Sequence, residues 1–392
     1  MTRRIPPDTK VAQHTPRRGV ALLAVLVAIL LISLLAIGSL SVARGDFTRA
    51  RDEQVMRSAA NAADAGAYDL LRRWPSNAYA SVPVGTTIGP DTLVRSAASA
   101  ISRTTRASRA VYWTVSVGSA GDSAARTLAR RAVQVAYRLA LPDIVTDAAL
   151  IARDSVSVID SARVVGTDTS LAAWGGACAL PRPTVAIALA DTTRLCDGSC
   201  GSGSSSGRIV GAPPLREDSS AANGARYRIF GAETWATLAA HAAVTLPAGT
   251  VITPAPVVSG ASCDRTHTNN WGAPGGVSPC GTYAPLIWAR GDLEMQGGVG
   301  QGVLLVDGDF TLSGGALFAG VVITRDDLRS LGVGGTVLGA VLAGDATIAA
   351  GDHTTIGGMT RVQRSHCAVD QALEWSARLV PLRQRAWAAL RD

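Results

Sequence analysis

Residues 20–42 read VALLAVLVAILLISLLAIGSLSV and contain no charged side chain. Their polar side chains are Ser33, Ser39 and Ser41. The run exceeds the length of about 20 residues that a helix needs to cross the hydrocarbon core of a bilayer. Hydrocarbon offers no partners to backbone N–H and C=O groups, so a segment that enters it must be helical. The sequence therefore predicts one transmembrane helix over these residues.

The charges around this run predict its orientation. Basic side chains precede it, at Arg3, Arg4, Lys10, Arg17 and Arg18. Positive charge is retained on the cytoplasmic side of a membrane helix, so we expect a cytoplasmic N-terminal tail and export of the rest of the chain. A cleaved secretory signal is the alternative interpretation, because residues 41–43 carry small side chains. However, the apolar core of such a signal is normally about 7–15 residues.

The helical pattern continues beyond the apolar run. Residues 44–74 contain no proline, and apolar positions recur there largely at steps of three and four residues, as on one face of a helix. Pro75 cannot continue a helix. We therefore predict one helix over residues 20–74, about 80 Å long, with a lipid-soluble first half and an amphipathic second half.

The residues at the start of this helix resemble a known leader. Arg17, Arg18 and Gly19 are followed by Val-Ala-Leu-Leu-Ala-Val-Leu-Val, which resembles the class III leader of type IV pilins and pseudopilins. The resemblance implies cleavage between Gly19 and Val20 by a prepilin peptidase. Most pilins have Glu at the fifth mature position, where this chain has Ala24. PilX-like minor pilins and K-type pseudopilins commonly lack that Glu.

A second stretch resembles the end of the PilX N-terminal domain, where residues 62–65 read Ala-Ala-Asp-Ala in place of the usual Ala-Ala-Glu-Ala. The resemblance implies a PilX-like minor pilin that sits in the inner membrane as a single-pass protein with a periplasmic C-terminal domain. It also implies incorporation into, or priming of, a type IV pilus. The implied partners are other pilins, contacted through the N-terminal helix, prepilin peptidase, the pilus assembly machinery and the lipid bilayer.

Two alternatives stay open at this point. The first is a K-type pseudopilin of type II secretion, which shares the leader and the missing Glu. The second is a membrane-anchored β-solenoid protein that binds or cleaves glycans.

Residues 111–117 and 132–137 alternate between apolar and polar side chains, which is typical of half-buried strands. With residues 93–101 they are expected to form a small antiparallel sheet on the second half of the helix, by analogy with pilin globular domains. Residues 197–223 are rich in Gly and Ser and predict a flexible, exposed loop.

A weak repeat occupies the C-terminal half. Four aspartates recur at steps of 17, 18 and 18 residues, at Asp292, Asp309, Asp327 and Asp345. Each follows a short apolar run and precedes an alternating one. A single unit cannot bury its apolar side, but stacked copies can, so we predict a parallel β-solenoid-like stack. Residues 150–158 are expected to be an earlier copy, with Asp154 in register.

The corners of the predicted stack have two interpretations. Gly298, Gly315 and Gly335 are expected to supply unusual backbone angles, and the recurrent aspartates to cap corner amides. A calcium ladder is the alternative, but the nonapeptide pattern GGxGxDxUx is absent from the sequence. We therefore predict no metal.

The chain has six cysteines, and an even number behind a membrane anchor indicates disulfides in an oxidising compartment. Cys263 and Cys280 flank a turn-rich loop and are the favoured pair. Pairing among the rest is left open, namely Cys178, Cys196, Cys200 and Cys367. Their spacing does not supply a full tetrahedral zinc set.

Neither nucleic acid nor catalysis is indicated. The net charge is +7, but the arginines of residues 44–74 are interleaved with acidic residues, and no basic stripe with interleaved aromatics occurs. No GxSxG, HExxH or P-loop pattern is present. Four histidines stand isolated in the sequence: His241, His267, His353 and His366. We expect a structural protein with no cofactor, not an enzyme.

The expected fold is thus α+β, with a long N-terminal helix, a small antiparallel sheet and a parallel β-solenoid-like stack that ends in a C-terminal helix. That last helix, over residues 367–392, is expected to cap the open end of the stack. The predicted segments are a leader (1–19), the long helix (20–74), a pilin-like β region (75–145), an irregular Cys-containing region with a first rung and a Gly/Ser loop (146–282), solenoid repeats (283–366) and the C-terminal helix (367–392).

Overall fold

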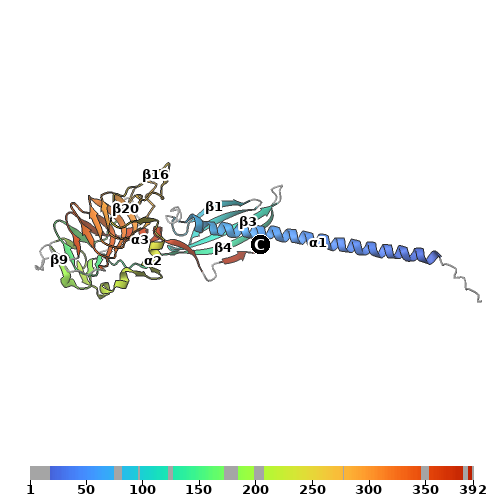
Figure 1. Cartoon of the computed structure of the whole chain (residues 1–392), viewed down its shortest axis with the longest axis horizontal. Coiled ribbons are helices and arrows are strands. Elements are labelled where there is room, and N and C mark those ends of the chain that lie inside the picture. Colours follow the sequence, from blue (N-terminus) through green and yellow to red (C-terminus); the bar gives the residue numbers. More distant parts are fainter. Residues whose placement is uncertain are drawn as a thin grey trace, which may run out of the picture.

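The computed structural model of the chain describes residues 18–74, 82–95, 98–121, 127–171, 184–197, 207–276, 278–345, 353–382 and 387–390. The molecule is elongated: a long helix extends from a small sheet, and a stack of parallel strands lies at the opposite end of that sheet (Figure 1). The predicted α+β fold class is confirmed by the long helix, the antiparallel sheet, the parallel sheets and a helix near the C-terminus.

Helix α1 spans Arg18–Arg73 without interruption, so it is about 84 Å long. Residues 22–54 are exposed along their whole length, whereas small side chains between residues 59 and 70 are buried. The buried positions recur at three- and four-residue steps, which puts them on one face of the helix.

That face packs on an antiparallel sheet in which neighbouring strands follow one another in the sequence, with the C-terminal strands at one edge. Sequence analysis expected one strand over residues 93–101, but two strands joined by a tight connection occupy this region. The strands are β1 (Thr87–Arg95), β2 (Ala98–Arg106), β3 (Val111–Gly121), β4 (Thr127–Ala140), β27 (Arg378–Pro381) and β28 (Trp387–Leu390).

The stack of parallel strands consists of two sheets that face each other across a common core. The first sheet contains β5 (Ala148–Ala152), β7 (Arg163–Val165), β8 (Val185–Leu189), β10 (Ile209–Val210), β11 (Leu215–Glu217), β14 (Val244–Leu246), β18 (Leu286–Ala289), β20 (Val299–Val306), β22 (Ala316–Thr324), β24 (Gly335–Ala343) and β26 (Arg361–Arg364). The second contains β6 (Val156–Val158), β9 (Leu195–Asp197), β15 (Thr250–Ile252), β19 (Leu293–Gln296), β21 (Phe310–Ser313), β23 (Leu328–Ser330) and β25 (Thr354–Ile356).

The order of strands in the stack differs from their order in the sequence. Strand β5 was expected before the first repeat, but it pairs in parallel with β24, the last long repeat strand. Strands β8 and then β11 continue the sheet beyond it. The chain therefore first forms the distal rungs, which are those farthest from the antiparallel sheet. It then runs back and begins the proximal rung, the one nearest that sheet, with β14, which pairs with β18. The sequence repeat cannot reveal this order, because every repeat unit has similar strand edges with which another strand can pair.

Three glycines lie in register on adjacent long strands: Gly302 pairs with Gly320, and Gly320 with Gly339. Their φ angles are 121°, 141° and 144°, a region that side chains with a Cβ rarely adopt. Corner glycines Gly298 and Gly315 also have positive φ, whereas Gly335 does not and its neighbour Gly334 does.

The predicted C-terminal helix is shorter than expected and lies elsewhere. Helix α3 spans His366–Ser376, and the chain then forms β27 and β28 on the edge of the antiparallel sheet. The expectation of helix over residues 367–392 was therefore wrong for residues 378–381 and 387–390, while residues 383–386 and 391–392 lie outside the described residues. Rather than capping an end of the stack, α3 packs its Val369 and Ala372 on the flank formed by β20, β22 and β24.

Two further segments complete the stack. Residues 219–243 contain η3 (Ser219–Ala222), η4 (Gly224–Tyr227), the β12–β13 hairpin (Ile229–Phe230 and Glu233–Thr234) and α2 (Trp235–Ala240), and they bury Tyr227 and Phe230 on the outer side of the first sheet. Part of the expected 197–223 loop is instead strands β10 and β11, while its residues 198–206 lie outside the described residues. The segment between β15 and β18 carries the projecting β16–β17 hairpin (Val258–Ser259 and Ser262–Cys263).

Candidate functional site

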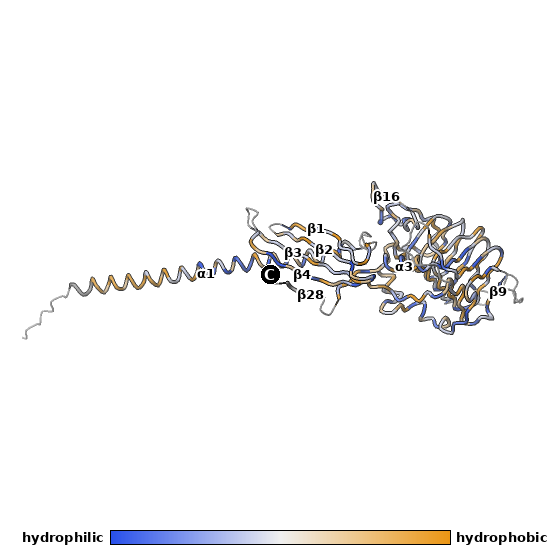
Figure 2. The backbone as a smooth tube through the Cα atoms, turned by 180° about the vertical axis from the view of Figure 1, so that it is seen from behind, coloured by the Kyte–Doolittle hydropathy of each residue, from blue (hydrophilic) through white to orange (hydrophobic). Residues whose placement is uncertain are grey.

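The first half of α1 is an exposed apolar rod, which we call the apolar arm (residues 22–42). Its large side chains are mostly more than half exposed; for example, Leu35 is 74% exposed and Ile37 is 67% exposed. By length and composition, α1 can cross a membrane. Figure 2 shows this hydrophobic half extending beyond the sheet, away from every other element. The fold itself buries none of it, so the arm is free for lipid or for helices of other molecules.

The predicted processing site lies at the start of this helix. Gly19 and Val20 are in the first helical turns of α1, and Ala24 is exposed on the apolar arm. Cleavage between Gly19 and Val20 stays a prediction. It would leave a helix that begins with the apolar arm.

The second half of α1 approaches the sheet closely because small residues line the contact. A Cβ on Gly118 of β3 would overlap the Ala59 carbonyl oxygen and the Ala63 amide of the helix. A Cβ on Gly66 of α1 would overlap the side chains of Ala100 and Ser116. Backbones can come this close only where a side chain is missing.

Two polar contacts fix the end of α1. The Tyr137 hydroxyl donates to the carbonyl oxygen of Ala67 at 2.6 Å, and burial raises the pKa of this Tyr. The Trp74 indole N–H donates to the carbonyl oxygen of Ala377 at 2.9 Å. The second contact joins the helix to the segment between α3 and β27, so it spans the boundary between the sheet and the stack.

A cluster of ion pairs, which we call the junction cluster, crosses the same boundary. Arg106 of β2 pairs with Glu374 of α3 at 3.2 Å, with side-chain exposures of 8% and 13%. Arg109 pairs with Glu374 and, at 3.0 Å, with Asp370. Desolvation lowers the pKa of Arg109, but the two carboxylates outweigh it and the net shift is upward.

A cavity of about 340 Å³ lies beside this boundary. Trp74 of α1, Tyr283 and Trp375 line it, together with backbone and side chains of residues 376–379. Its aromatic walls come from the helix, the insertion before β18 and α3, so the long helix, the sheet and the stack meet around it.

Cys263 and Cys280, the pair favoured from the sequence, are joined by a disulfide. It closes the insertion between β15 and β18, where Cys280 is fully buried. Next to it, the buried Asn270 amide donates to the carbonyl oxygen of Val257 at 3.0 Å. Trp271 fills the proximal end of the core against Phe318. Cys196 and Cys367 are also disulfide-bonded, whereas Cys178 and Cys200 lie outside the described residues.

Two of the four recurrent aspartates, Asp292 and Asp309, cap backbone amides of neighbouring rungs. Asp292 Oδ1 accepts from the backbone N–H of Asp309 at 3.0 Å, and Asp309 Oδ1 accepts from that of Asp327 at 3.1 Å. Arg329 pairs with Asp309 at 3.0 Å and with Asp327 at 3.6 Å. Within the described ranges, no group of three or more His, Cys, Asp or Glu side chains is arranged to hold a metal ion.

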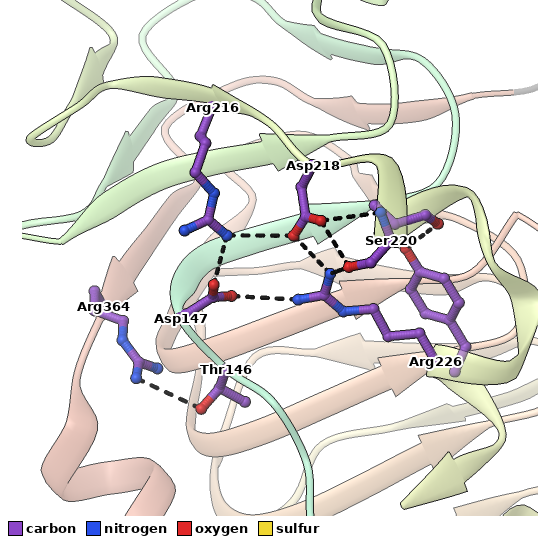
Figure 3. Close-up of polar contacts among 9 residues, drawn as sticks. Thr146, Asp147, Arg216, Asp218, Ser220, Arg226 and Arg364 are labelled. Atoms are coloured by element: carbon purple, nitrogen blue, oxygen red, sulfur yellow. Dashed lines mark hydrogen bonds and ion pairs between the residues drawn. The ribbon is translucent and has the colours of Figure 1, made fainter.

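A closed ring of ion pairs sits at the distal end of the stack (Figure 3). Asp147 pairs with Arg216 at 2.5 Å and with Arg226 at 3.3 Å. Asp218 pairs with the same two arginines, at 3.3 and 2.7 Å. Burial raises the pKa of Asp218, but hydrogen bonds from Ser220 and Arg226 outweigh it and hold the pKa at about 2. The ring ties the linker before β5 to the last rung.

Sequence reasoning missed this ring, the junction cluster and one further pair. His366, treated as isolated, contacts the buried Asp168 through Nδ1, and its backbone N–H donates to the same carboxylate at 2.8 Å. With Ser365, whose hydroxyl accepts from Ala368, Asp168 fixes the start of α3. These partners are about 200 residues apart in the chain, so no local pattern indicates them.

No protein-family model matches the chain, and no curated protein matches it. The crystal structure of the competence-associated pilin ComZ from Thermus thermophilus is similar, with a TM-score of 0.24 and 10% sequence identity, over 86% of this chain and 98% of that chain.

Proposed function

We propose that this chain is a membrane-anchored, pilin-like structural subunit that assembles through its N-terminal helix. More specifically, we propose a PilX-like minor pilin of the inner membrane that is cleaved between Gly19 and Val20 and joins or primes a type IV pilus. Its N-terminus is cytoplasmic and its folded part periplasmic in this proposal. Its partners are then other pilins, prepilin peptidase and the assembly machinery.

One observation carries the proposal: a single continuous helix is packed on a sheet over its second half and left bare over its first. Burial of apolar surface is favourable by about 25 cal/mol per Å², so an exposed apolar rod of this length needs a partner. Lipid satisfies that need in a monomer, and the arms of neighbouring subunits satisfy it in a filament.

The mature N-terminus tests this function. We expect mass spectrometry of protein from its native membrane to find a chain that starts at Val20. Gly19→Asp should leave the leader in place and reduce incorporation into sheared filaments, whereas Gly45→Ala on the same helix should do neither. An unprocessed wild-type chain, or one that begins near Arg44, would contradict the proposal.

The apolar arm provides a second test. A charge at the centre of a membrane helix costs about 2.5–3.5 kcal/mol of apparent insertion free energy, so Ile32→Asp should shift the protein from the membrane to the soluble fraction. Ile32→Leu is the matched control and should insert normally. Equal membrane retention of both variants would rule out the arm as the anchor.

We also propose a structural rather than a catalytic role for the stack. In support, one carboxylate oxygen of Asp292 and one of Asp309 each accept a hydrogen bond from a backbone N–H of the next rung. Binding on a glycan array, or glycan hydrolysis lost in Asp309→Ala, would contradict this role.

A further inference from the structure

The face of the antiparallel sheet opposite α1 carries a strip of apolar side chains along β3, where a solvated face would be polar. We call this face the outer sheet face. Polar side chains such as Thr105 and Gln134 lie beside the strip on β2 and β4. Ile101 is 44% exposed, Trp113 is 37% exposed and Val94 is 69% exposed, and Val115 and Val117 are half-buried. No helix of the described chain covers this face, since α1 packs on the other side.

Strand register joins these side chains into one patch. Ile101 of β2 lies opposite Val117 of β3, which lies opposite Ala132 of β4. Trp113 lies opposite Ala136 on the same face. Directly opposite side chains on neighbouring strands are about 5 Å apart, so the apolar residues are contiguous rather than scattered. A contiguous apolar patch of this kind marks an interaction site.

The charges around the patch have one sign. Arg103, Arg130 and Arg138 are exposed on this face, and none forms an ion pair with another described residue. The described strand residues of this face include no carboxylate. Arg130 and Arg138 are eight residues apart on β4, hence about 26 Å along the strand. Arg103 lies opposite Val115, beside the middle of the patch, whereas Arg130 and Arg138 lie near its two ends. Apolar side chains beside arginines match the anatomy of protein interfaces, where Trp and Arg are enriched.

Two other kinds of partner fit less well. The antiparallel sheet lies alongside α1, with its strands roughly along the helix axis (Figure 1). When α1 stands perpendicular to a bilayer, the outer sheet face is therefore also perpendicular to that bilayer and cannot lie flat on it. Single-stranded nucleic acid needs several aromatic platforms for successive bases, and Trp113 is the one aromatic residue among the described residues of this face.

We propose that the outer sheet face docks a second, different protein, which presents an apolar strip flanked by carboxylates. The proposed filament assembly leaves this face accessible: with α1 turned toward the filament core, the opposite face of the sheet points outward. The partner would pack its apolar strip on Ile101, Trp113 and Val117, and its carboxylates would pair with the three arginines.

A photoreactive phenylalanine in place of Val115, introduced in the full-length protein in its native cells, tests the inference. We expect one discrete protein adduct whose cross-linked peptide carries acidic residues beside apolar ones. Arg103→Glu/Arg130→Glu should reduce its yield by about tenfold or more, because it sets like charges opposite each other. Arg163→Glu, an exposed change on β7 of the stack, should leave the yield unchanged.

Several outcomes would overturn the inference. These are no adduct, an adduct with lipid, an adduct with another copy of this chain, or a yield that the charge reversal does not change. The photoreactive residue at Val251 of β15 should give no matching adduct. Each variant is checked for membrane retention and for a mature N-terminus at Val20, so loss of assembly is distinguished from loss of docking.

Discussion

The two halves of this molecule use apolar residues in opposite ways. The helix–sheet half buries small side chains such as Ala59 and Ala63 at a close contact and leaves the apolar arm bare. The stack buries large side chains such as Phe310 and Phe318 within its core. The difference indicates that the stack is stable through its own core, whereas the helix keeps its largest apolar surface for other molecules.

Glycine substitutions should have the largest effects, and each should destabilise only the half of the molecule in which it lies. Gly118→Val would push α1 from the sheet, and Gly320→Val would break the stack, because a Cβ at either position overlaps backbone atoms. We expect each to cost more than about 4 kcal/mol in its own half, measured by hydrogen exchange of α1 and of β20–β24. Gly45 of α1 faces open space, so Gly45→Ala should instead stabilise the helix, by up to about 1 kcal/mol.

Glu374→Gln should weaken the connection between the halves by about 3 kcal/mol, because it leaves the buried Arg106 without its charged partner. Asp370→Asn should have a smaller effect, since this carboxylate is 42% exposed. Limited proteolysis between the sheet and the stack measures the coupling. Equal protection in Glu374→Gln and in the unchanged protein would show that the junction cluster does not hold the halves together.

Loss of the disulfide should act on the stack alone. Cys263→Ser/Cys280→Ser opens a loop with a sequence separation of 17, and the expected loss is about 3 kcal/mol in the unfolded-state account. Thermal unfolding followed by Trp fluorescence reports it, because Trp271 lies beside the loop. Faster exchange in α1 would contradict a local effect.

The smallest of these effects on stability is expected from acid, which should destabilise the distal end of the stack. The pKa of Asp218 is about 2 in the folded protein, below its ordinary value of about 3.9. Its stabilising contribution is therefore present above about pH 4 and lost as the pH falls towards 2. Asp218→Asn should be less stable than the unchanged protein by about 1–2 kcal/mol at neutral pH, and the gap should close in acid. A gap that persists near pH 2 would contradict this account.

The sequence alone determined the long helix, because an uncharged apolar run in a bilayer has one backbone solution and Pro75 ends the pattern that follows it. It also determined that stacked units with recurrent aspartates form parallel strands, and Cys263 with Cys280 stood out by their local spacing. These features depend on short-range chemistry, which is readable from neighbouring residues.

The tertiary structure alone decided which units stack on which, where α3 ends, and how the halves are joined. β5 pairs with β24 across almost 200 residues, and residues 378–381 and 387–390 add strands to β4 although their pattern fits a helix. Arg106 meets Glu374 across 268 residues. Such choices depend on which edges and charges remain unsatisfied after the local elements form, and that information is spread over the whole chain.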